Sequence, residues 1–107
     1  MDKHRLADMV QGWFVGDFDP AAYKTPLCEV AYKKHKKGEF WPKHYQKQAV
    51  EINYLIRGVL EINGQRFVDG DIFTIHPKEI AEPTFVSDCE LIVVKLPSLG
   101  IQDKVEC

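Results

Sequence analysis

The sequence is poor in cysteine and has no excess of positive charge. Its three cysteines, Cys28, Cys89 and Cys107, are an odd number, and their spacing matches neither a disulfide framework nor a zinc knuckle. Lys and Arg number 14 against 16 Asp and Glu, which gives a formal net charge of -2. Because nucleic-acid binding needs a surplus of basic side chains on one surface, we do not expect nucleic acid as the main partner.

Long apolar runs are also missing. No stretch of about 18 apolar residues occurs, and residues 1–13 lack the apolar core of a signal peptide. We therefore expect no membrane association and a cytoplasmic location. The 107 residues, 45% hydrophobic and 28% charged, predict one globular domain with a small-molecule ligand.

Helical periodicity is confined to residues 4–10, and most of the chain shows the pattern of β-strands instead. Short segments alternate apolar and polar residues and are separated by Gly, Pro, Asn and Asp. Asn63-Gly64 predicts a hairpin, because both positions of a two-residue hairpin turn need positive φ. Such regular spacing predicts an all-β sandwich or barrel. The expected strands span residues 13–18, 27–35, 49–58, 59–68, 69–77, 82–88 and 89–98.

Glu51 interrupts an otherwise apolar strand, and two interpretations of it are open. Side chains alternate between the faces of a strand, so Glu51, Asn53 and Leu55 share one face. If the opposite, apolar face fills the core, then Glu51 points to water. If Glu51 points into a polar cavity, another layer or subunit must cover the apolar face. The residues of that apolar face are Val50, Ile52, Tyr54 and Ile56.

The spacing around Glu51 resembles the first motif of the cupin superfamily, G-x5-H-x-H-x4-E-x6-G. Gly38, His44, Glu51 and Gly58 fall on its positions, and Gln46 stands where the second His is expected. The resemblance implies a jelly-roll barrel, or double-stranded β-helix, of the RmlC-like type.

The second cupin motif, G-x5-P-x-G-x2-H, is matched more loosely. It begins at Gly70, and Pro77 comes one residue late. Glu79 then replaces the second glycine and Glu82 replaces the His.

The resemblance also sets the expected domain bounds. A single cupin domain would span residues 1–107, with a core at about 27–98. An N-terminal strand at 12–18 and a short C-terminal tail would flank this core.

In cupins the motif residues commonly hold a divalent metal inside the barrel. By resemblance, His44, Gln46, Glu51 and Glu82 would converge on one site. One imidazole nitrogen and three potential oxygen donors form a hard set that suits Mn²⁺, Mg²⁺ or Fe²⁺, and Zn²⁺ or Ni²⁺ could also occupy it. Without metal, two adjacent carboxylates would need a proton or the His44 imidazolium, and a His–carboxylate pair is capable of acid–base chemistry.

Three classes of function stay open at this point. The resemblance implies binding of, or action on, a small molecule such as a sugar or a small organic acid. The alternatives are a metal-free ligand-binding or sensor protein and a structural dimeric subunit, so whether the chain is an enzyme is undecided. An inward Glu51 would also imply a homodimer, because the apolar face would then be buried against a second copy.

We expect structural roles for several other residues. We expect the basic run at 32–38 to be a solvated strand end, and Trp13 and Trp41 to be packing or interface aromatics. We expect His76 to lie at the surface or rim.

Overall fold

The computed structural model describes every residue from Met1 to Cys107, and strands dominate it. Two short 3-10 helices, η1 (Leu6–Asp8) and η2 (Gly100–Asp103), are the helical elements. No helix has the length and apolarity needed to cross a membrane. The strands are β1 (Trp13–Gly16), β2 (Tyr23–Lys24), β3 (Glu29–His35), β4 (His44–Gln46), β5 (Val50–Arg57), β6 (Val59–Ile62), β7 (Gln65–Val68), β8 (Ile72–Ile75), β9 (Pro83–Phe85), β10 (Cys89–Leu96) and β11 (Lys104–Glu106).

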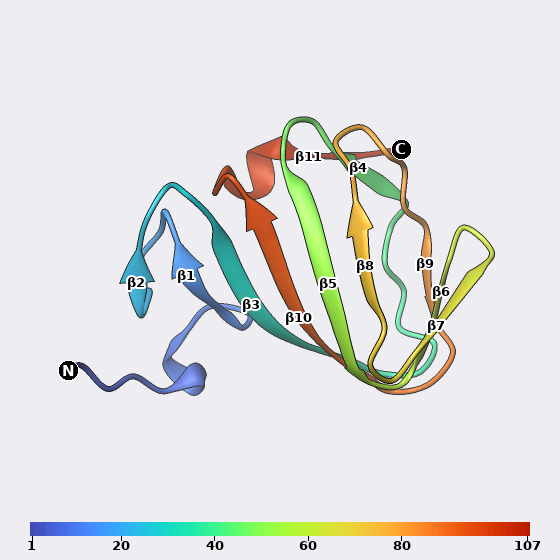
Figure 1. The fold of residues 1–107 in the computed structure, drawn as a ribbon, viewed down its shortest axis with the longest axis horizontal. Helices are drawn as coiled ribbons and strands as arrows, with labels where there is room; N and C mark the ends of the chain where they lie inside the picture. Colours follow the sequence, from blue (N-terminus) through green and yellow to red (C-terminus); the bar gives the residue numbers. More distant parts are fainter.

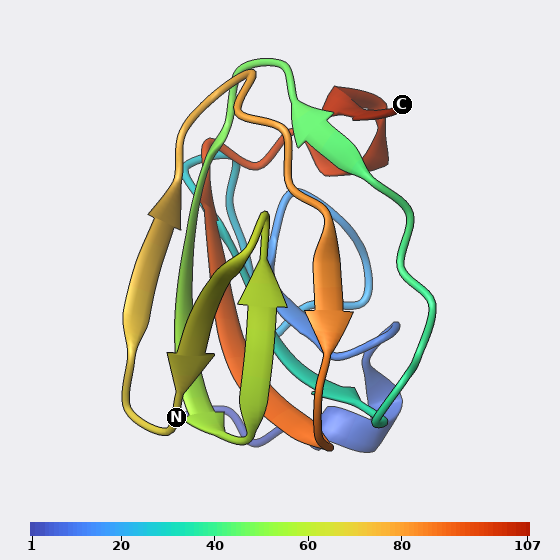
Figure 2. The same ribbon diagram turned by 90° about the vertical axis from the view of Figure 1, so that its right-hand side faces the viewer.

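The strands form two facing layers. One layer is a six-stranded sheet in the order β2-β1-β3-β10-β5-β8 (Figure 1). The other layer holds the three-stranded sheet β7-β6-β9 and the two-stranded sheet β11-β4 (Figure 2). Every ladder is antiparallel except β1 with β2. The all-β class expected from the strand pattern is confirmed.

A compact apolar cluster fills one end of the space between the layers. Leu55 is fully buried, and Cys89 beside it is 2% exposed. Burial raises the pKa of the Cys89 thiol, so this cysteine stays protonated and acts as a small core residue. The cluster consists of Leu55, Leu60, Phe85, Cys89, Leu91 and Val93.

Two turns depend on glycine for their backbone conformation, and one of these glycines, Gly58, is also the last position of the first cupin motif. Asn63 and Gly64 have φ values of 52° and 84°, which are the positive angles that the predicted hairpin between β6 and β7 requires. Gly58, between β5 and β6, has a φ of 119°, and a Cβ there would lie 2.4 Å from the Asp88 carbonyl oxygen. A side chain at position 58 would therefore push β6 away from the start of β10.

The C-terminal segment that the sequence assigned to a tail is part of the fold. β11 pairs with β4, so that Lys104 lies opposite Gln46. The carboxylate of Asp103, 3% exposed, accepts hydrogen bonds from the backbone N–H groups of Gln48 and Ala49 at 3.0 Å each. These bonds attach the end of the chain to the loop before β5.

The orientation of β5 decides between the two interpretations of Glu51. Asn53 is 5% exposed and Leu55 is fully buried, so the odd-numbered face, with Glu51, points between the layers. Tyr54, at 43%, and Ile56, at 37%, lie on the outer face of the six-stranded sheet. Glu51 therefore points inward, and the interpretation that placed it in water is wrong.

Candidate functional site

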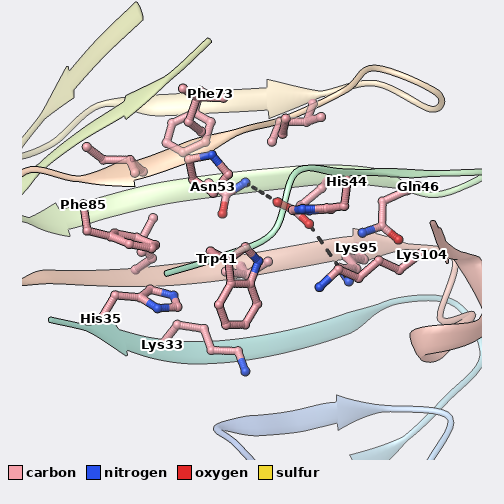
Figure 3. Close-up of a pocket in the computed structure, with 18 of the residues that line it drawn as sticks. Lys33, His35, Trp41, His44, Gln46, Asn53, Phe73, Phe85, Lys95 and Lys104 are labelled. Carbon is pink, nitrogen blue, oxygen red and sulfur yellow. Dashed lines mark hydrogen bonds and ion pairs between the residues drawn. The ribbon is translucent and has the colours of Figure 1, made fainter. Parts of the chain in front are cut away.

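A cavity of about 110 Å³ lies between the two layers, next to the apolar cluster. Its walls are mixed: aromatic and aliphatic side chains from both layers enclose a polar group of residues (Figure 3). Inward-facing positions of β3, β5 and β10 supply part of the polar group, and β4 and β11 supply the rest. The polar residues are Lys33, His35, His44, Gln46, Glu51, Asn53, Lys95 and Lys104.

His44 and Gln46 bring two buried polar side chains from β4 to this cavity. They are two apart on β4, so both point the same way, and they are 8% and 3% exposed. The Pro42 carbonyl lies 2.8 Å from Nδ1 of His44 and can only accept, so Nδ1 carries a proton and Nε2 is left for a ligand. Oε1 of Gln46 is buried and has no hydrogen-bond partner. Buried polar atoms are rarely left unpaired in proteins, so Oε1 is an exception, while the side-chain amide as a whole lines the cavity.

Glu51 is neutralised by protein groups. Its Oε2 accepts a hydrogen bond of 2.9 Å from the Asn53 side-chain amide. Its Oε1 lies 4.0 Å from Nζ of Lys95, and the two side chains are only 14% and 12% exposed. The counter-charge that the sequence analysis sought in His44 or a metal is therefore a lysine on the neighbouring strand.

Three lysines face the cavity over indole rings. Nζ of Lys33 and Nζ of Lys95 lie 5.1 and 5.2 Å from the centroid of the same Trp13 ring, and Nζ of Lys104 lies 4.8 Å from that of Trp41. Burial, followed by the nearby charge of Lys95, lowers the pKa of both Lys33 and Lys104. Three lysines therefore share a space that holds one carboxylate, which makes the cavity attractive to an anion.

His35 lies at the other side of the cavity and is paired with a carboxylate. Its Nδ1 is 2.5 Å from Oε2 of Glu39, and its ring stacks on Phe85 with a centroid separation of 4.2 Å. The hydrogen bond to His35 is the main reason that the pKa of Glu39 is lowered. This pair fixes the ring of His35 between Phe85 and the edge of Trp41.

The structure brings together three of the four residues predicted from the cupin motifs. His44, Gln46 and Glu51 line the cavity, whereas Glu82 is exposed and lies outside it. The residue that faces the cavity beside His44 is Ala81, which is 3% exposed. Ala81 and His44 exchange two backbone hydrogen bonds, of 2.8 and 3.0 Å.

The second motif was therefore placed one residue too late. Counted from Gly70 without an insertion, its second glycine falls on Lys78 and its His falls on Ala81. Lys78 has a φ of 68°, the left-handed conformation for which glycine is usually chosen. The backbone thus keeps the motif geometry, although neither characteristic side chain is present.

The side chains at this site do not fit a resident divalent metal. No group of three or more His, Cys, Asp and Glu side chains is placed to hold one. Within the cavity, two imidazoles and one carboxylate are accompanied by three lysines, His35 is already paired with Glu39, and Lys95 already neutralises the carboxylate. A doubly charged cation would be repelled by this set.

Several cavity residues escaped the sequence analysis. The basic run at 32–38 was expected to be solvated, but Lys33 and His35 point inward while Lys34 between them is exposed. Strand parity, applied to that run as it was to residues 50–56, would have found them. Trp13 and Trp41 line the cavity beneath the lysines, a pairing between distant segments that no local pattern contains.

Comparison with known proteins places the fold. No protein-family model matches the sequence, and no curated protein matches it. Among solved structures, a protein with a double-stranded β-helix domain from Klebsiella pneumoniae matches with a TM-score of 0.69 and 17% identity, over 78% of this chain and 72% of that chain. An RmlC-like cupin from Ralstonia eutropha matches with a TM-score of 0.59 and 14% identity, over 68% of this chain and 50% of that one. The chain has the cupin fold.

The structural neighbours also include a protein of described activity. Pac13 of Streptomyces, a nucleoside dehydratase, has a TM-score of 0.65 and 17% identity, over 78% of this chain and 70% of that one. A variant of Pac13 has been solved with uridine. KdgF from Halomonas has a TM-score of 0.64 and 20% identity, over 73% of this chain and 76% of that one. These identities show the fold, and the ligand of this chain must be argued from its own cavity.

Proposed function

We propose that this cupin binds a small organic acid in the cavity between its sheets and needs no metal to do so. The observation that carries the proposal is the presence of Lys33, Lys95 and Lys104 around a space with Glu51 as its one carboxylate. Binding an anion there would remove the repulsion among the ammonium groups, and metal binding would add to it. Of the two ligand classes implied by the cupin resemblance, this charge balance favours the acid over a neutral sugar.

The size of the cavity limits the ligand. Apolar cavities of about 150 Å³ accept benzene, which has six non-hydrogen atoms, so a cavity of 110 Å³ suits a molecule of at most about six non-hydrogen atoms. A two- or three-carbon carboxylic acid falls in that range. A nucleoside such as the uridine bound by Pac13 would need the walls to open.

The remaining polar atoms suit an acid that also carries a hydroxyl or carbonyl group. The carboxylate would lie against the lysines, whose positions over the two indole rings hold their ammonium groups in place. The side-chain amide of Gln46, which lines the cavity, would hydrogen-bond to the ligand hydroxyl or carbonyl group. Nε2 of His44 is placed to exchange a proton with the ligand.

A fluorescence titration tests this proposal. Both tryptophans of the chain line the cavity, so tryptophan emission should change when lactate, pyruvate or acetate is added to chelator-treated protein. A ligand this small should bind with a Kd of about 10 µM to 1 mM. Lys104→Met should weaken binding at least about tenfold, because a charge-assisted contact contributes about 1.5–3 kcal/mol. The matched control Lys34→Met, on the outer face, should leave binding unchanged. Equal affinity in the two variants would contradict the proposal.

We further propose that the outer face of the six-stranded sheet binds a second copy of this chain. Tyr54 faces Ile92 and Ile72 on the neighbouring strands, and Ile52 faces Val94, so apolar side chains form a continuous band. Tyr54 is 43% and Ile72 is 69% exposed. The charged pair at the end of the band, Arg57 with Glu90, is neutral overall, which suits a self-complementary two-fold contact.

A further inference from the structure

We propose that Lys33 is a nucleophile that forms an imine with the carbonyl carbon of a small 2-oxo acid bound in the cavity. This inference rests on the proposed function, because the acid must first be held by its carboxylate. Lys95 and Lys104 would hold that carboxylate, and Lys33 would reach the adjacent carbonyl carbon. The assignment follows from the geometry around Trp13 and from the partners of each lysine.

Two ammonium groups that lie against one indole ring repel each other. Lys33 and Lys95 approach Trp13 from neighbouring strands, β3 and β10, with Nζ to centroid distances of 5.1 and 5.2 Å. A single ring cannot offset the repulsion between two full charges, and the side chain of Lys95 is only 12% exposed. Either an anion lies close to both lysines or one of them gives up its proton. A 2-oxo acid fits both cases, because its carboxylate is the anion and its carbonyl carbon reacts with a neutral amine.

Lys33 is the lysine best placed to give up its proton. Lys95 is already paired with the Glu51 carboxylate. Lys104 has Glu106 and Glu51 nearby, and both favour its charged form. Glu39, the acid near Lys33, is already bound to His35, while Lys95 and Lys104 both disfavour the charge on Lys33. Burial and these two cations together lower the pKa of Lys33.

The nitrogen of Lys33 is also held in position. Nζ donates a hydrogen bond of 2.6 Å to the backbone carbonyl of Gln11. A neutral amine can make this bond with one N–H and keep its lone pair for the ligand. The side chain lines both the cavity and the surface pocket that Leu6, Gln11 and Trp41 border. Lys33 therefore lies between the cavity and the surface pocket, where a ligand could enter.

The chemical step is a condensation without net oxidation or reduction. The lone pair of the Lys33 nitrogen attacks the carbonyl carbon, and the carbonyl π-bond opens to give a carbinolamine after proton transfer. The former carbonyl oxygen then leaves as water with the two hydrogens of the amine, and the C=N bond forms. His44, whose Nε2 is free, lines the same cavity and would relay a proton.

Reductive trapping tests the proposal. Chelator-treated protein is incubated at neutral pH with pyruvate and sodium cyanoborohydride, which supplies the hydride that fixes the imine. Intact mass should show one coupled pyruvate per chain, and peptide mapping should place it on Lys33. Because a lowered pKa leaves more of the Lys33 amine unprotonated at neutral pH, Lys33 should react faster than the exposed lysines of the chain.

Two variants separate loss of the imine from loss of binding. Lys33→Arg keeps the positive charge but cannot form an imine, so its trapped product should fall at least about tenfold, while lactate still binds within about threefold of wild type. Lys34→Met should be trapped like wild type.

Each other result of these experiments would contradict a specific part of the proposal. Trapping that persists in Lys33→Arg, or that falls on Lys104, overturns the assignment of the nucleophile. Pyruvate that binds but is not trapped overturns the imine and leaves the binding of acids intact. Failure of both lactate and pyruvate to bind overturns the proposed function and this inference with it.

Discussion

Inside the barrel, Nζ of Lys95 lies 4.0 Å from Oε1 of Glu51, and both side chains are nearly buried. In the cupin motif that this sequence resembles, the glutamate is one of the residues that commonly bind a metal cation. In this chain the same glutamate has a lysine and the amide of Asn53 as partners. This pair explains why the geometry of a cupin metal site can persist around a cavity with an excess of positive charge.

Glu51→Gln tests the electrostatic role of this carboxylate. The substitution keeps an oxygen for Asn53 but leaves three lysines without a counter-charge in the cavity. We expect the free energy of unfolding to fall by about 1–3 kcal/mol in urea denaturation. Adding Lys95→Met to Glu51→Gln should restore most of the loss. If Glu51→Gln alone is as stable as wild type, the carboxylate does not balance the lysines.

Lys33→Met should change the pH dependence of stability. The pKa of Lys33 is lowered in the folded protein from a reference of 10.5, so between these two values the unfolded chain binds more protons than the native one. Stability must therefore rise with pH in that window. The variant, which carries no charge there, should be more stable than wild type near pH 7, and its advantage should shrink as pH rises toward 10.5. A constant difference in unfolding free energy between about pH 7 and pH 10 would contradict the lowered pKa.

The register of the second motif can be tested by building a metal site. In a Gln46→His background, Ala81→His would place a third imidazole beside His44, because position 81 faces the cavity. Glu82→His in the same background is the control, since position 82 is exposed. Co²⁺ or Ni²⁺ binding, measured by absorption or calorimetry, should be at least about tenfold tighter with His at 81 than with His at 82. Equal affinities would show that our register is wrong.

The proposed contact between two copies through the outer face of the six-stranded sheet predicts that the protein is a dimer in solution. Light scattering should give twice the 12.3 kDa of one chain at micromolar concentration. Ile72→Lys and Tyr54→Lys place a charge in the apolar band and should shift the protein toward the monomer. Val68→Lys is the matched control, because Val68 is 46% exposed on β7 in the other layer. A wild-type mass near 12.3 kDa would remove the proposed dimer.

The fold could be predicted from the sequence because its signals are local. The Asn63-Gly64 turn, the alternation along 50–56 and the spacing from Gly38 to Gly58 each depend on neighbouring residues. Parity also placed Glu51 and Asn53 on one face, although only the packing of Leu55 showed that this face is inside.

The charge of the cavity could not be predicted in the same way. Lys95 meets Glu51 across a strand pair, and Lys104 comes from a segment that the pattern assigned to a tail. Glu82 was assigned because the second motif was aligned on Pro77, and the single residue inserted for that alignment moved the assignment to the solvent side. The error arose because side-chain identity was followed where backbone spacing was the better guide.

The most direct test of the account is calorimetric titration of one chelator-treated sample with pyruvate and, separately, with MnCl₂. We predict saturable binding of pyruvate with a Kd of about 10 µM to 1 mM, and no saturable binding of Mn²⁺ over the same concentrations. Stoichiometric binding of Mn²⁺ that is lost in Glu51→Ala, together with no heat from pyruvate, would show that the cavity is a cation site and contradict the account.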